Sequence, residues 1–156
     1  MNWASIKQYF SDHGALVDIY YEDMRDDSWI NLFNWLSVND SLESVNCYSP
    51  RKDENLEEIP DNVADLINEK GFYCFVSLLI NGITLVLRFY EKDELECDIS
   101  PKEIESEEKL ISLFTILDEI KNITGVNNYV MCPENAKENV FNKNGIFSLT
   151  SKMNPN

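Results

Sequence analysis

An Asn-Gly pair between two β-rich runs constrains the fold of this chain more than any other feature. Residues 72–80 (FYCFVSLLI) and 83–91 (ITLVLRFYE) flank Asn81 and Gly82. Both turn residues must tolerate a positive φ, so this arrangement is the strongest short-range signal of a two-residue β-hairpin. Such a turn also sets the register of the two strands, and therefore which side chains share a face.

That register predicts a sheet with two unlike faces. One face is wholly apolar and must be covered; it carries Phe72, Cys74, Val76, Leu78, Ile80, Ile83, Leu85, Leu87 and Phe89. The other face mixes polar and aromatic side chains and is expected to be partly exposed; it carries Tyr73, Phe75, Ser77, Leu79, Thr84, Val86, Arg88 and Tyr90. Apolar residues at 95, 97 and 99 alternate with acidic residues at 96 and 98, which predicts a third antiparallel strand and a meander.

Helical periodicity predicts the elements that cover the apolar face. A helix over residues 106–123 is expected to begin at Glu107 and Glu108, to stop near Gly125 and to pack on the hairpin. Its apolar stripe consists of Leu110, Leu113, Phe114, Leu117 and Ile120. A second helix, capped by Asp27 or Ser28, would bury Trp29, Leu32, Phe33 and Leu36, and shorter helices are expected around 3–10 and 60–69.

The remaining segments complete an α+β fold. Alternation over residues 15–22 predicts a strand whose outer face is partly acidic, weaker strands are expected near 129–131 and 146–149, and residues 46–59 are expected to form an exposed loop. We predict one domain over residues 1–156, with disordered last residues. Its antiparallel sheet is centred on the 72–91 hairpin, continues to a strand near 95–99, and is packed on one face by helices including 106–123.

The charge of the chain limits its partners. With 28 Asp and Glu against 13 Lys and Arg, the formal net charge is −15. A field of this sign repels nucleic acid and anionic membrane surfaces and attracts basic proteins. The natural inference is a basic protein partner, although the charge can also serve solubility alone.

The cysteines and the N-terminus favour a cytoplasmic protein. Cys47, Cys74, Cys97 and Cys132 have long, unequal spacings without a C-x-x-C pair, so neither a zinc site nor another metal site is predicted. Residues 1–10 lack the apolar core of a signal peptide. We therefore expect reduced cysteines, mostly buried as small apolar side chains.

No catalytic motif is evident, and we predict neither an enzyme nor a cofactor. Nucleophile-elbow, P-loop, dinucleotide-binding and metalloprotease patterns do not occur, and the chain has five glycines. The single histidine, His13, precedes Gly14 where a first helix should end, and is expected to cap that helix or face solvent. Serine or cysteine nucleophiles would have only this one imidazole as a base.

The acidic residues form two clusters that adjoin tyrosines. The first candidate partner-binding set, which we favour slightly because one strand row points outward, is Asp18, Tyr20, Glu22, Asp23, Asp26 and Asp27. The second candidate set is Tyr73, Tyr90, Glu91, Asp93, Glu94, Glu96 and Asp98. Carboxylates steer and pair with Lys or Arg, while tyrosine rings supply contact area at low entropic cost. The alternatives are a merely solvated strand edge and an apolar docking patch around Phe75 and Tyr90.

The chain resembles the bacterial immunity proteins of polymorphic and contact-dependent growth-inhibition toxin systems. The resemblance rests on size, acidity, the N-terminal aromatic helix, the Asn-Gly hairpin, and the segments 26–33 (DDSWINLF), 118–125 (DEIKNITG) and 130–135 (VMCPEN). It implies a protein that binds a cognate toxin domain, in many cases a basic nuclease, and blocks its active site or a neighbouring surface. An acidic adaptor or scaffold module and a hydrolase of unrecognised type remain as alternatives.

Overall fold

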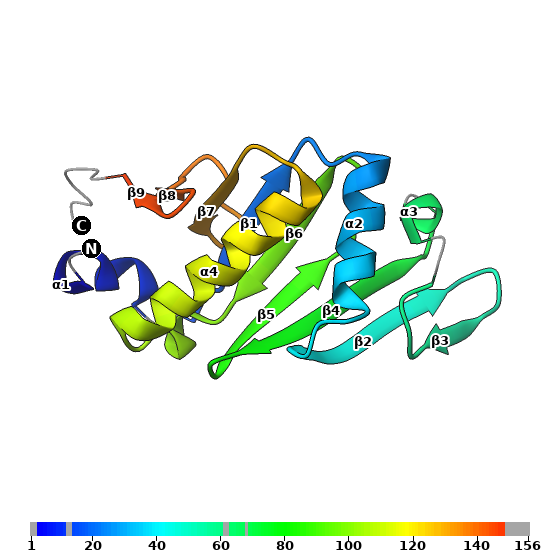
Figure 1. The fold of residues 1–156 in the computed structure, drawn as a ribbon, viewed down its shortest axis with the longest axis horizontal. Helices are drawn as coiled ribbons and strands as arrows, with labels where there is room; N and C mark the ends of the chain where they lie inside the picture. The colour runs from blue at the N-terminus through cyan, green and yellow to red at the C-terminus, as the bar shows by residue number, and fades with distance from the viewer. Residues whose placement is uncertain (1–2, 12–13, 61–62, 68, 149–156) are drawn as a thin grey trace.

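The chain folds around one large antiparallel sheet. The computed structural model describes residues 3–11, 14–60, 63–67 and 69–148. The nine strands lie in the order β3-β2-β4-β5-β6-β1-β7-β8-β9 (Figure 1). Their bounds are Val17–Glu22 (β1), Leu42–Ser49 (β2), Glu54–Leu56 (β3), Tyr73–Ile80 (β4), Ile83–Arg88 (β5), Glu94–Ile99 (β6), Tyr129–Pro133 (β7), Asn142–Lys143 (β8) and Ile146–Phe147 (β9). The predicted α+β class is confirmed.

The central hairpin and its third strand match the prediction. Asn81 and Gly82 both have positive φ values, of 50° and 74°, and Ile80 pairs with Ile83. β6 pairs with β5 and completes the meander. The predicted apolar face is buried at Val76, Leu78, Ile83, Leu85, Leu87 and Phe89, and partly buried at Ile80 and Phe72.

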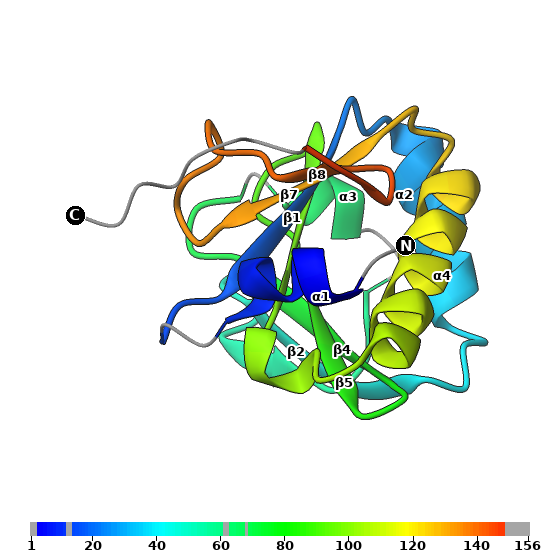
Figure 2. The same cartoon turned by 90° about the vertical axis from the view of Figure 1, so that its left-hand side faces the viewer.

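Two long helices lie side by side over one face of the sheet (Figures 1 and 2). α4 (Glu107–Thr124) begins after Ser106, whose hydroxyl accepts a hydrogen bond from the Lys109 amide, and ends at Gly125 with φ 70°. α2 (Asp26–Leu36) places Trp29 and Phe33 against Phe89, with ring centroids 5.6 and 5.5 Å from it. The predicted covering helix is confirmed, and α2 shares the same role.

The start of α2 corrects a detail of the prediction. The helix begins at Asp26, and Arg25, in an extended conformation, is the N-cap, where Asp27 or Ser28 was expected. Asp27 still serves the helix start, because its Oδ1 accepts a hydrogen bond from the Ser28 amide at 3.1 Å. Two acidic residues in the first turn also complement the helix dipole.

The expectation of an exposed loop over residues 46–59 is wrong for half of the segment. Residues 46–49 belong to β2, which pairs with β4 beside the central hairpin, and residues 54–56 form β3. Side chains of β2 alternate between exposed Asn46, buried Cys47 and half-buried Tyr48. The polar residues of β2 gave no strand pattern in the sequence, because pairing with β4 rather than apolar content stabilises this strand.

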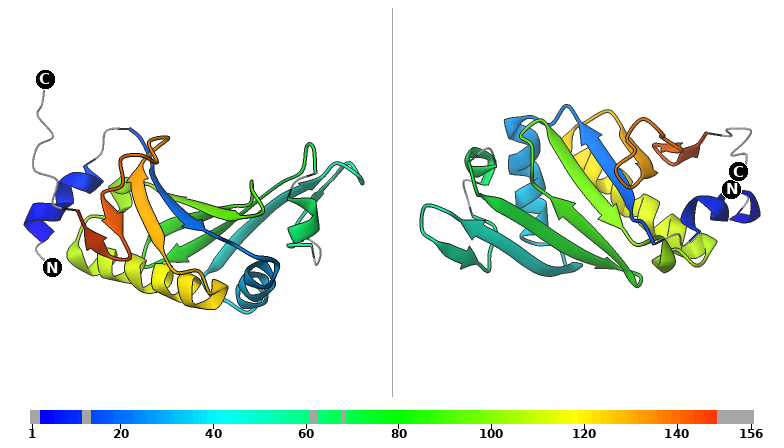
Figure 3. Two further views of the ribbon diagram at one scale, coloured as in Figure 1. Left: turned by 90° about the horizontal axis from the view of Figure 1, so that it is seen from above. Right: turned by 180° about the vertical axis from the view of Figure 1, so that it is seen from behind.

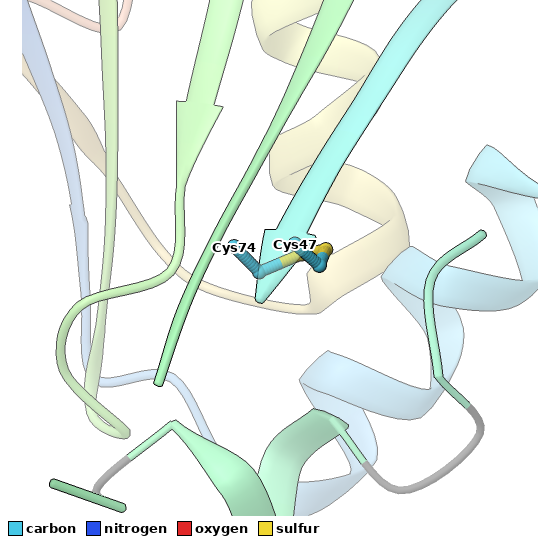
Figure 4. Close-up of a disulfide and its surroundings, with 2 residues drawn as sticks. All are labelled: Cys47 and Cys74. Carbon is cyan, nitrogen blue, oxygen red and sulfur yellow. A yellow bond between two sulfur atoms is a disulfide. The ribbon is translucent and has the colours of Figure 1, made fainter. Parts of the chain in front are cut away.

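The pairing of β2 with β4 also brings two cysteines together. Cys47 lies opposite Cys74 in the register, and the two are joined as a disulfide in the core (Figure 4). The expectation that all four cysteines are reduced is therefore wrong for this pair. Because residues 46–59 were predicted as a loop, nothing in the sequence placed Cys47 next to Cys74. Cys97 and Cys132 are free and buried, as expected.

Short helices and the last strands complete the fold. They are α1 (Trp3–Ile6), the 3-10 helices η1 (Lys7–Phe10) and η2 (Pro101–Glu103), and α3 (Val63–Leu66). The rings of Tyr9 and Phe10 pack on Phe141 and Phe147, which ties the N-terminal helices to the β8–β9 hairpin. The helices predicted around 3–10 and 60–69 correspond to α1 with η1 and to α3. The strands predicted near 129–131 and 146–149 correspond to β7 and β9. His13, predicted to cap the first helix or face solvent, lies outside the described residues. The last residues, predicted to be disordered, lie outside them too.

Candidate partner-binding surface

The second face of the sheet is the candidate functional surface. Seen from behind, its central strands lie in front of α2 and α4 (Figure 3, right). Because successive side chains of a strand point to opposite faces, residues that alternate with the core occupy this face. We call it the open face; it presents the outward side chains of β2, β4, β5, β6 and β1.

Antiparallel pairing of β1 with β6 brings the two predicted acidic clusters together. Asp18 lies opposite Asp98, Tyr20 opposite Glu96, and Glu22 opposite Glu94. The paired residues are 72 to 80 positions apart in the chain, so the sequence alone leaves the clusters as two separate candidates. They form one surface, with acidic residues facing each other across the strand pair.

At one end of this strand pair the carboxylates line a hollow. We call it the acidic hollow, and the residues that line it are Glu22, Asp23, Glu91, Asp93 and Glu94. Asp23 has a positive φ of 63°, and the Met24 amide donates a hydrogen bond to the Asp93 carbonyl at 2.9 Å, which joins the two chain turns at this point. The hollow therefore combines members of both predicted clusters.

A lysine from a third segment lies at the edge of the hollow. Lys137 Nζ is 2.8 Å from Glu22 Oε1 and is also paired with Glu94. The same ammonium lies 4.6 Å from the centroid of the Tyr20 ring, within the range of a cation–π contact. Sequence reasoning missed Lys137, because no local pattern links it to residues on β1 and β6.

The segment after β7 also covers part of the predicted outward row. Asp18 and Tyr20 are 4% and 9% exposed, so the expectation that they project into solvent is wrong. The Asn135 amide and the Tyr20 hydroxyl donate hydrogen bonds to Asp18 Oδ2, at 2.9 and 3.2 Å. Glu22 and Asp23, at the end of the strand, are exposed.

Asp26 and Asp27 lie at the start of α2 and pair with neighbouring cations. Asp26 is 3.1 Å from Lys92 Nζ, and Asp27 is 3.2 Å from Arg25 Nε. Neither residue lines the acidic hollow. The first predicted set is therefore divided between the covered part of β1, the hollow and the start of α2.

An aromatic ladder adjoins the acidic strands on the open face. The Tyr73 ring is stacked against the Tyr48 ring and against the Phe75 ring, at centroid distances of 5.6 and 6.1 Å respectively. The Arg88 guanidinium lies 5.7 Å from the Phe75 centroid, pairs with Asp98 and donates to the Tyr90 hydroxyl at 3.4 Å. Tyr48 was missed because its strand was predicted as a loop, whereas Tyr73 and Tyr90 were predicted and are 38% and 48% exposed.

Burial, together with neighbouring carboxylates, raises the pKa of two acidic groups on this face. Burial, and after it the negative charge of Asp18, raises the pKa of Glu96, although Arg88 acts in the opposite direction. Burial likewise raises the pKa of Asp18, and its hydrogen bonds from Asn135 and Tyr20 only partly offset this. Asp98 is 6% exposed and is held by Arg88, so the exposed position expected for it is also wrong.

In the described part of the chain, no group of three or more His, Cys, Asp and Glu side chains is arranged to hold a metal ion. None of the helices described is long and apolar enough to cross a membrane.

The fold and this surface define an acidic α+β protein with one helix-covered and one open sheet face. The same fold occurs in a chain of the crystal structure of the toxic C-terminal tip of CdiA from Pseudomonas aeruginosa in complex with its immune protein. The superposition has a TM-score of 0.56 and 16% sequence identity, and covers 86% of this chain and 97% of that chain. No protein-family model matches the sequence, and no curated protein matches it.

Proposed function

We propose that this chain is an immunity protein that binds and neutralises a cognate toxin domain. The observation that carries the proposal is the shared fold: most of this chain superposes on a chain from a complex between a toxin tip and an immune protein. The independent resemblance in size, acidity and sequence segments to immunity proteins supports the same assignment.

The shape and charge of the surface favour neutralisation by occlusion. A sheet face with aromatic and acidic side chains suits contact with another protein surface, since aromatic rings and charge complementarity dominate such interfaces. In this proposal the chain acts in the cytoplasm of the toxin-producing cell, without catalysis or a cofactor. A net charge of −15 favours a basic toxin domain, such as a nuclease.

The proposal is tested with the product of the neighbouring reading frame, which should contain a toxin domain. Expression of that domain alone should arrest growth, and co-expression of this chain should restore it. The purified pair should elute as one complex and bind with nanomolar or tighter affinity, since neutralisation requires slow release.

A non-cognate toxin domain of similar charge is the matched control and should remain toxic. Binding without relief of toxicity would favour the adaptor alternative. Absence of binding would refute the immunity proposal.

A further inference from the structure

We infer that the toxin docks on the open face, with a Lys or Arg side chain in the acidic hollow and apolar or aromatic side chains on the ladder of Tyr48, Tyr73 and Phe75. The inference rests on the proposed function and specifies its interface. It joins members of both candidate binding sets, Glu22 and Asp23 from the first and Glu91, Asp93 and Glu94 from the second, and excludes the helix-covered side of the sheet.

The chain itself shows that this surface holds a basic side chain. Lys137 lies 38 positions after the end of β6, and its ammonium lies between Glu22 and Glu94 over the Tyr20 ring. Carboxylates on two sides and an aromatic face below are the contacts that a lysine or arginine of a partner protein would seek. Lys137 thus marks the geometry by which the surface binds cations.

Most of the hollow is left without such a cation. Among the described residues, no ion pair is formed by Asp23, Glu91 or Asp93. Lys92, which lies between two of them in sequence, turns to Asp26 instead, at 3.1 Å. The hollow therefore keeps an excess of negative charge that a basic partner can neutralise without breaking an internal ion pair.

The aromatic ladder supplies the apolar half of the interface. Phe75 lies opposite Arg88, and Arg88 lies opposite Glu96, so one row of side chains runs from the ladder to the acidic strands. Tyr90, 48% exposed and hydrogen-bonded to Arg88, borders this row. Exposed aromatic groups next to carboxylates give both area and charge complementarity to a basic protein segment.

Two pairs of matched variants test the inference. Glu91→Gln with Asp93→Asn removes two charges from the hollow, while Glu57→Gln with Glu58→Gln removes two charges from an exposed segment after β3. Because both variants have the same net charge, long-range steering changes equally. Tyr73→Ala removes a ladder ring, and Ile111→Ala removes a 51% exposed side chain from α4 on the other side of the molecule.

We expect the hollow variant and Tyr73→Ala each to raise the dissociation rate from the toxin domain about tenfold, and their controls to change it less than about twofold. Equal weakening by the hollow variant and its charge-matched control would overturn the inference, as would an unaltered rate in both open-face variants. In each of those cases wild-type neutralisation would persist, so the proposed function would stand.

A probe independent of the toxin separates the two proposals further. Titration with a hexa-arginine peptide, followed by amide chemical shifts, should perturb Tyr20, Tyr90 and Glu94 first, and the hollow variant should weaken that binding severalfold more than its control. Shifts centred on α2 and α4 would contradict the assignment of the cation site, whatever the toxin assay shows.

Discussion

The two faces of the sheet are made by the same strands but follow different rules. On β5, Leu85 and Leu87 are fully buried beneath the helices, whereas Val86 and Arg88, one position away, lie half-buried on the open face. On the covered face the side chains must fill space, so only apolar residues of suitable volume fit. On the open face packing restricts the sequence less, and carboxylates can crowd together.

Truncation of a covered side chain should give the largest effect. Leu87→Ala would leave a cavity between the hairpin and the helices and should lower the free energy of unfolding by roughly 2–5 kcal/mol. Thr84→Ala, on the open side of the same strand, should cost about 1 kcal/mol or less. Denaturant unfolding measures both, and a loss below about 1 kcal/mol for Leu87→Ala would break the distinction between the faces.

Reduction of the Cys47–Cys74 bond should have the next largest effect. The bond closes a segment with a sequence separation of 27 between β2 and β4, and constrains the unfolded chain. Adding dithiothreitol should lower the free energy of unfolding by about 2–4 kcal/mol. A Cys47→Ala and Cys74→Ala double variant should not respond to the reductant. An unaltered unfolding midpoint in the wild type would mean that the two thiols pack side by side without a bond.

Removal of Lys137 should speed toxin binding but lower the stability of the fold. Lys137→Gln would free Glu22 and Glu94 and should speed association with a basic toxin domain severalfold at low salt. The same change should lower stability by about 1 kcal/mol or less, since these ion pairs are partly exposed. Lys143→Gln on β8 makes the same charge change away from the hollow. Equal association rates in the two variants would argue against the hollow as the docking point.

The smallest predicted effect concerns pH. Because burial and nearby carboxylates raise the pKa of Glu96, the folded protein holds this proton more tightly than the unfolded chain does. The stability contributed by this group is present below the ordinary carboxyl pKa and is lost as the pH rises through the raised value. Glu96→Gln should therefore be slightly more stable than the wild type at pH 7, and the difference should shrink towards acidic pH.

Urea unfolding across this pH range measures the difference. Glu58→Gln, which removes one charge from an exposed segment, controls for net charge. A stability gap for Glu96→Gln that is constant with pH would show that Glu96 is not protonated more readily in the folded state.

Sequence reasoning was most accurate where local signals and packing agree. The Asn81-Gly82 turn, the alternation on β4 and β5, and the stripe of α4 all predicted the covered face, because burial demands an apolar side chain at each inward position. β2 was missed because its partner β4 stabilises a strand that is polar by itself. Lys137 and the burial of Asp18 could not be predicted, because both depend on where the segment after β7 returns across the sheet.

The position of β1 has a consequence for how the protein is made. β1 lies between β6 and β7, so the first strand of the chain finds its two neighbours only after residues 94–99 and 129–133 have been synthesised. Until the second of these emerges from the ribosome, β1 has one free edge, and such edges invite association with other chains. A nascent chain or a product truncated before residue 129 would lack both the β1–β7 pairing and Lys137. The β6–β1–β7 part of the sheet thus forms only after residue 133 has been synthesised.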